Sequence, residues 1–164
     1  MVSTAVGLEN IHQGFEFTVS STLDTVDANP GDGIAADSLG RATLRAAIME
    51  ANSLPGSHRI VLAGGLYTLT RAGANENAAL TGDLDITGDI TIVDQQIEST
   101  VIDGGDLDRV FHVLPSGKLT VTSITIQNRQ RQRQWRRSFQ PGKSHVAECR
   151  AVGQRGHGGR RGDE

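Results

Sequence analysis

The chain has 164 residues, a length typical of one domain, and it contains 20 Gly but only four Phe, one Tyr and one Trp. Its core must therefore come from Ile, Val and Leu, as in layered β folds rich in tight turns. The single cysteine, Cys149, excludes an intramolecular disulfide. No apolar run reaches the roughly 18 residues of a membrane-spanning helix, and no signal peptide is readable at the N-terminus.

The net charge of −3 conceals a division of the chain at Asn128. Residues 1–128 hold 6 basic and 16 acidic side chains, a net charge of −10. Residues 129–164 hold 10 basic and 3 acidic side chains, a net charge of +7. We therefore interpret the chain as two pieces of different chemical character.

The first elements are a leader and a strand. Residues 1–14 carry no pattern, and we expect them to form a loose leader. Phe15, Phe17 and Val19 alternate with polar residues, which predicts a strand at residues 15–19.

An acidic, turn-rich loop follows at residues 24–33. Asp27, Asn29 and Asp32 offer oxygen ligands of the kind that bind calcium. The EF-hand spacing fails at Gly31, however, and no acidic residue follows at the bidentate position. Asx-turns and a Pro-Gly turn explain the same residues, so we favour turns and assign no metal.

A short amphipathic helix is predicted over about residues 43–53. Its apolar face consists of Leu44, Ala47, Ile48 and Ala51, at the spacing of one helical face. Thr43 stands where an N-cap belongs, because its hydroxyl can accept a hydrogen bond from a free backbone N–H of the first turn. Pro55 and Gly56 follow as a stop signal.

The residues from Gly31 to Asn52 resemble the CSLREA module, which is found at the N-terminus of many bacterial secreted or surface β-helix proteins. The matching positions are Leu44, Arg45, Ile48, Ala51 and Asn52, with Thr43 in place of the family's Ser. Ala35 and Ala42 replace the two family cysteines. Ala46 replaces the Glu of a capping box, so a Glu at position 46 is expected to stabilise the helix start. The resemblance spans roughly residues 15–128.

Arg45 has two interpretations. It is either a ligand-facing cation at the mouth of a cleft, or one half of an ion pair with an Asp of the preceding loop. We favour the ion pair, because an Arg at the start of a capping helix is more often a tether between helix and loop.

From His58 onward, short apolar pairs separated by turn residues replace the helical pattern. They are Ile60/Leu62, Tyr67/Leu69, Leu84/Ile86, Ile90/Ile92, Val101/Ile102, Val110/Phe111/Val113, Leu119/Val121 and Ile124/Ile126. A weak repeat aligns residues 84–94 with residues 119–128. The strands are very short, and no Asn-Gly or Asp-Gly pair forms a two-residue hairpin loop between matched strands. The pattern therefore favours rungs of a parallel β-helix over the hairpins of a sandwich.

Residues 100–105 and 124–128 also resemble rung sequences of the pectin-lyase-like superfamily. That resemblance implies enzymes that act on acidic polysaccharides, with carboxylates that bind calcium and an Arg or Lys as base. The acids of this region are Asp83, Asp85, Asp89, Asp94, Asp103, Asp106 and Asp108, and we expect most of them to be solvated at turns. Arg109, beside Asp106 and Asp108, is the best enzymatic candidate, although a surface ion pair is favoured. His112 alternates with Phe111 and Val113 and is expected to point outward; the histidines show no metal-ligand spacing.

The predicted fold is mainly β: right-handed parallel β-helix rungs at residues 58–128, behind a cap module at residues 15–57 whose helix covers the open end. The resemblance implies a non-catalytic, extracellular or cell-surface protein in adhesion or surface display, with a carbohydrate or another cell-surface polymer as its ligand. No catalytic residue, cofactor or metal is assigned. The structural residues are Thr43, Leu44, Arg45, Ile48 and Asn52.

Two alternatives remain open. The first is a polysaccharide lyase or hydrolase, and the second, weaker one is nucleic-acid binding through the basic tail. Residues 129–137 read as a basic, Trp-bearing arm. They interrupt a rung directly after Asn128, however, where the family continues with Gly and Asn.

The tail has a further interpretation at the level of codons. Residues 129–139 can be encoded so that skipping one nucleotide gives Gly-Asn-Gly-Asn-Gly-Asn-Gly-Gly-Gly-Leu. Residues 140–145 then give Ser-Asn-Gln-Gly-Lys-Val-Thr, a turn and a next strand. We therefore interpret residues 129–164 as an out-of-frame, disordered tail behind a frameshift that truncates the β-helix, with no evolved role for Trp135 or Cys149.

The nucleotide sequence of the gene tests this interpretation. We expect the shifted frame after codon 128 to resume alternating β-strand residues. A stop codon within a few residues of that frame, or loss of the alternation, would contradict the frameshift and restore the nucleic-acid interpretation.

Overall fold

The computed structural model describes residues 14–95, 100–107 and 109–127, so the predicted tail and almost all of the predicted leader lie outside it. The described part is mainly β, as predicted, with a single helix within those ranges. The elements are β1 (Glu16–Val19), α1 (Leu44–Ser53), β2 (Ser57–Leu62), β3 (Gly65–Thr68), β4 (Leu84–Ile86), β5 (Asp89–Asp94), β6 (Thr100–Asp103), β7 (Phe111–Val113), β8 (Lys118–Thr122) and β9 (Thr125–Gln127).

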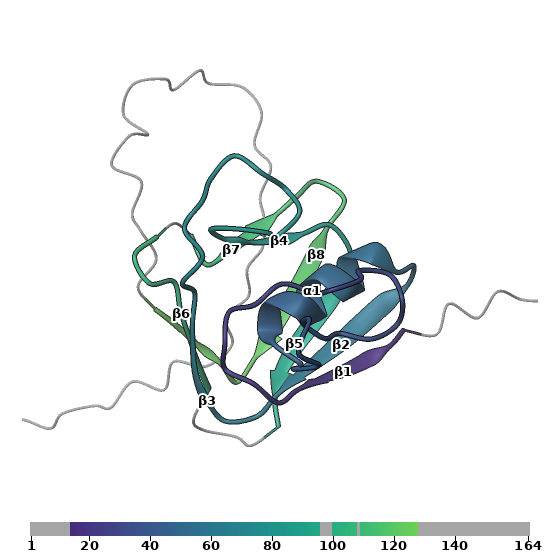
Figure 1. Cartoon of the computed structure of the whole chain (residues 1–164), viewed down its shortest axis with the longest axis horizontal. Helices are drawn as coiled ribbons and strands as arrows, with labels where there is room; N and C mark the ends of the chain where they lie inside the picture. The colour runs from purple at the N-terminus through teal and green to yellow at the C-terminus, as the bar shows by residue number, and fades with distance from the viewer. Residues whose placement is uncertain (1–13, 96–99, 108, 128–164) are drawn as a thin grey trace, which may run out of the picture.

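The strands form three sheets, and every strand pair within the described residues is parallel. The sheet orders are β1-β2-β5-β8, β3-β6-β9 and β4-β7. From β2 onward the chain therefore supplies strands to the three sheets in a fixed order. Figure 1 shows β4 beside β7 above α1, and β3 beside β6 at the left. Because hairpins are antiparallel, this pairing excludes the hairpin alternative for the described strands.

The strand register differs from the predicted repeat. The sequence pattern aligned Leu84 with Leu119, whereas the structure pairs Leu84 with Phe111 and places Ile90 beside Leu119. The prediction was therefore wrong: it matched each strand to the one that follows its actual partner in the chain. It failed because parallel register follows the lengths of the turns between strands, whereas all the inward positions carry similar apolar residues.

Glycines allow successive turns to approach one another. A Cβ on Gly105 would overlap the carbonyl oxygen of Leu69, and a Cβ on Gly117 would overlap that of Ile86. Gly105 also has a positive φ of 59°. Glycine is therefore required at both turns, since no side chain fits the space between the chains.

The three sheets and the helix share one apolar core. Its fully or nearly buried members include Val19 of β1, Leu44 and Ile48 of α1, Ile60, Leu62, Ile90 and Ile92 of the first sheet, Tyr67 and Ile102 of the second, and Leu84 and Ile86 of the third. The predicted cap module at residues 15–57 and the strands that follow it are therefore packed as one unit. β1 begins at Glu16, one residue later than predicted, and the ring of Phe15 is 45% exposed.

The helix start confirms the predicted N-cap. The Thr43 hydroxyl accepts a hydrogen bond from the Ala46 N–H at 3.2 Å and donates one to the Thr25 carbonyl at 2.7 Å. Ala46, however, is fully buried. A glutamate there would place a carboxylate in the apolar interior, so Ala46→Glu is expected to destabilise the fold rather than strengthen the cap.

Asn52, at the other end of α1, bonds the free edge of β4. Its amide nitrogen donates to the Asp85 carbonyl at 2.7 Å. Its amide oxygen accepts from the N–H groups of Thr87 at 2.9 Å and Gly88 at 3.2 Å. Because β4 has no strand on this side within the described residues, one side chain satisfies the backbone groups that a neighbouring strand would otherwise pair.

Asn52→Ala should therefore lower the free energy of unfolding by about 2–4 kcal/mol, since it leaves these backbone groups without partners. Ser53→Ala is the matched control, because the Ser53 hydroxyl bonds only the Met49 carbonyl of its own helix and its loss should cost about 0.5 kcal/mol or less. Urea unfolding measures both. Equal losses in the two variants would contradict the edge role of Asn52.

Candidate functional site

The most concentrated group of chemically active side chains lies beside β4 and β7. Asp83, Asp85 and His112, called here the Asp–His cluster, each offer a ligand atom, and these atoms lie within 4.8 Å of one another. Within the described residues, no other set of three His, Cys, Asp or Glu side chains comes so close together. Arg109 adds a guanidinium to the group through an ion pair with Asp83.

Strand register brings the cluster together. Asp85 and His112 occupy paired positions on β4 and β7, although 27 residues separate them in the chain. The His112 Nδ1 atom lies 2.8 Å from Asp85 Oδ1, and the Ala79 N–H donates to Asp85 Oδ2 at 3.0 Å. Asp83 immediately precedes β4, and its Oδ2 atom accepts a hydrogen bond from Arg109 Nε.

Both carboxylates of the cluster are buried, with Asp83 4% and Asp85 0% exposed. Burial raises the pKa of Asp85 above its ordinary value, the negative charges of Asp83 and Glu76 add to that rise, and hydrogen bonds from Ala79 and His112 oppose it. The expectation that these acids are solvated was therefore wrong for Asp83 and Asp85. It was also wrong for Asp103, which is 8% exposed and accepts a hydrogen bond from the Gln127 side chain.

Arg109 forms an ion pair, as favoured from the sequence, but the carboxylate that it binds is buried rather than at the surface. One partner is Asp83, which the sequence did not suggest because 26 residues separate the two. The Arg109 side chain is 46% exposed, so it lies at the boundary between the cluster and solvent. Asp108, one of the two partners considered from the sequence, lies outside the described residues.

Arg45 supports the loop that covers the cluster. It is 1% exposed, and its Nε atom lies 2.5 Å from Asp24 Oδ1, which confirms the predicted ion pair with an Asp of the preceding loop. The same guanidinium donates to three loop carbonyls, those of Ala79, Gly82 and Asp83, at 2.8, 2.9 and 3.3 Å. A side chain so enclosed does not face a ligand, so Arg45 is structural.

The acidic loop forms the predicted Asx-turns. Asp27 Oδ1 accepts from the Asn29 N–H, and Asp32 Oδ1 accepts from the Ile34 N–H, each at 2.8 Å. Asp27 is only 6% exposed, and its second oxygen has no hydrogen-bond partner. Burial raises the pKa of Asp27, and the charges of Glu50 and Asp32 raise it further.

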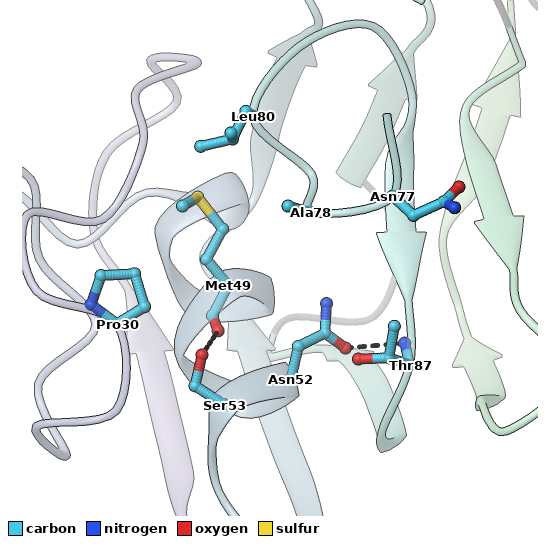
Figure 2. A pocket seen from close by; sticks show the side chains of 8 residues that line it. All are labelled: Pro30, Met49, Asn52, Ser53, Asn77, Ala78, Leu80 and Thr87. Carbon is cyan, nitrogen blue, oxygen red and sulfur yellow. Dashed lines mark hydrogen bonds between the residues drawn. The ribbon is translucent and has the colours of Figure 1, made fainter. Parts of the chain in front are cut away.

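A cavity of about 350 Å³ lies between α1 and the loop that precedes β4. Figure 2 shows Leu80 and Met49 facing one another across it, while the amide of Asn77 is turned away from both. The polar groups of Asn52 and Ser53 at its wall are already hydrogen-bonded. The cavity is thus mostly apolar and offers little for the recognition of a polar substrate.

Sequence reasoning missed the Asp–His cluster because its members are neither neighbours nor spaced as in known metal motifs. A signal was present: Leu84-Asp85-Ile86 and Phe111-His112-Val113 share an apolar–polar–apolar pattern. Aligning these two triplets would have placed Asp85 beside His112.

Comparison with known proteins gives no match: no family, curated protein or solved structure is similar to this chain. Helices long and apolar enough to cross a membrane are absent from the described residues.

The raised pKa of Asp27 predicts a pH dependence of stability. Because the folded pKa exceeds the ordinary value of 3.8, the folded state binds this proton more tightly than the unfolded state. The contribution of Asp27 is therefore most favourable below about pH 3.8 and is lost as the pH rises through the folded pKa. Asp27→Asn keeps the Asx-turn acceptor, and at pH 7 it should raise the free energy of unfolding by about 1 kcal/mol.

Thermal melting between pH 3 and pH 7 measures this effect. The matched control is Asp32→Asn, which changes an exposed carboxylate with the same kind of turn bond. We expect a higher melting temperature at pH 7 for the Asp27 variant alone. A lower one would show that the buried carboxylate is stabilised by its surroundings.

Proposed function

We propose that the chain is the capped N-terminal part of a right-handed parallel β-helix of the CSLREA type, with a non-catalytic role in adhesion or display at the cell surface. One observation carries the proposal: from β2 onward, parallel strands are assigned to three sheets in a fixed order. In the first sheet their partners are about 30 residues apart, as 32 for Ser57 and Asp89 and 29 for Asp89 and Lys118. A chain that coils through three sheets produces this order.

The residues that match the CSLREA motif support the capping part of the proposal. Leu44 and Ile48 belong to the shared core, Arg45 binds the loops on either side of the helix, and Asn52 bonds the edge of β4. A motif whose role is to cap the end of a β-helix requires residues of these types. Its loss would leave an open sheet edge, which promotes aggregation.

The outer face of the first sheet is the proposed binding face. Glu16, Arg59, Thr91 and Thr120 form one row across its four strands. Glu16 and Arg59 make an exposed ion pair, and Thr120 is also exposed. A row of hydroxyl and charged groups is suited to the hydroxyl groups of a carbohydrate polymer, which need hydrogen-bond partners along an extended surface.

A second candidate is a polysaccharide lyase or hydrolase, which the Asp–His cluster with Arg109 favours. We rank it lower because the reactive groups are already paired with one another, Asp83 with Arg109 and Asp85 with His112. Asp85 is also covered by the loop that carries Ala79, so no substrate reaches its carboxylate in this arrangement. The nucleic-acid interpretation depends on residues 129–164, which lie outside the described residues.

Retention on insoluble cell-wall polysaccharides, combined with a turnover assay on pectate and glycosaminoglycans, tests the proposal. We expect retention without release of unsaturated products or reducing ends. The double variant Thr91→Ala/Thr120→Ala should weaken retention several-fold, whereas Thr70→Ala, at an exposed threonine outside the row, should not change it. Steady turnover would overturn the non-catalytic role, and the absence of retention on every polymer would overturn adhesion through this face.

A further inference from the structure

We propose that Asp83, Asp85 and His112 form a binding site for a divalent transition-metal ion, with Zn²⁺ as the most suitable probe. The ion would join β4, the residue that precedes it, and β7. This inference rests on the Asp–His cluster alone and holds whether or not the chain is a β-helix.

The spacing of the ligand atoms suits one ion. Zn²⁺ binds carboxylate oxygen and imidazole nitrogen at about 2.0–2.2 Å, so ligand atoms around one ion lie roughly 3–4 Å apart. The three side chains here present such atoms within 4.8 Å of one another. Small rotations of the side chains close the remaining gap, because the backbone register already places Asp85 opposite His112.

Charge and burial also favour a cation. Asp83 and Asp85 are both at least nine-tenths buried, and buried charges are normally paired or bound to metals. Arg109 supplies one positive charge to Asp83, and Arg45, which reaches the Asp83 carbonyl, is itself paired with Asp24.

The surroundings hold the ligands and leave a way in. The Ala79 N–H orients Asp85, as outer-shell partners do in metal sites, whereas Arg109 occupies Asp83 Oδ2 and competes with the ion for it. The His112 side chain is 31% exposed, so an ion can enter from solvent at that side. The mixed oxygen and nitrogen donors select a transition metal over Ca²⁺, which prefers six to eight oxygens.

Zn²⁺ titration of the full chain without an affinity tag, in competition with a chromophoric chelator, tests the site. Wild type should bind one Zn²⁺ that His112→Gln and Asp85→Asn each weaken at least about tenfold. Asp89→Asn is the matched control, because Asp89 is an acid of the next strand outside the cluster, and it should leave the affinity unchanged. Co²⁺ should give a visible absorption band that His112→Gln alters.

Arg109→Gln is expected to change the Zn²⁺ affinity in the opposite direction from His112→Gln and Asp85→Asn. Its guanidinium competes with the metal for Asp83, so its removal should tighten Zn²⁺ binding several-fold, whereas a purely structural role of the cluster predicts no gain. Equal affinity in wild type, His112→Gln and Asp85→Asn would assign the ion to other histidines or Cys149 and overturn the site. Stronger binding of Ca²⁺ than of Zn²⁺ would overturn the assigned ligand set.

Discussion

The buried pair of Arg45 and Asp24 connects the parts of this structure that the chain order leaves separate. The Arg45 guanidinium lies in the interior and binds Asp24 through two nitrogens, at 2.5 and 3.3 Å. Asp24 in turn accepts from the N–H groups of Thr70 and Arg71. Helix, acidic loop and the loop before β4 are therefore held at one point. Since removing one partner of such a pair leaves an uncompensated buried charge, each of these segments depends on the other two.

The Arg45–Asp24 pair also determines whether Asp85 is buried or solvated. Arg45 fixes the loop carbonyls of Ala79 and Gly82, and the fixed loop covers Asp85. A carboxylate that would be solvated on the outer side of a strand is thus enclosed beside His112. The burial of the Asp–His cluster therefore depends on the loop that Arg45 holds, and not on strand β4 alone.

Much of the local structure was predictable from the sequence, because it depends on neighbours in the chain. The Thr43 cap, the helix and the positions of the short strands follow from periodicity and turn residues. The strand register and the Asp–His cluster were not predictable in the same way, because inward positions such as Leu84 and Ile90 are chemically alike and only turn lengths decide which strands meet. The pairing of Arg109 with Asp83 was missed for the same reason.

The parallel pairing over long sequence separations also has a kinetic consequence. Each strand of the first sheet after β2 pairs with one about 30 residues earlier. Non-local pairings of this kind slow folding, because the entropy of closing the intervening chain is lost before any hydrogen bond forms. Addition of strands to the first sheet from its N-terminal end matches the direction of synthesis on the ribosome, where α1 and β2 emerge before β5 and β8. In the first sheet, β2 is thus the strand on which β5 pairs, and β5 is the strand on which β8 pairs.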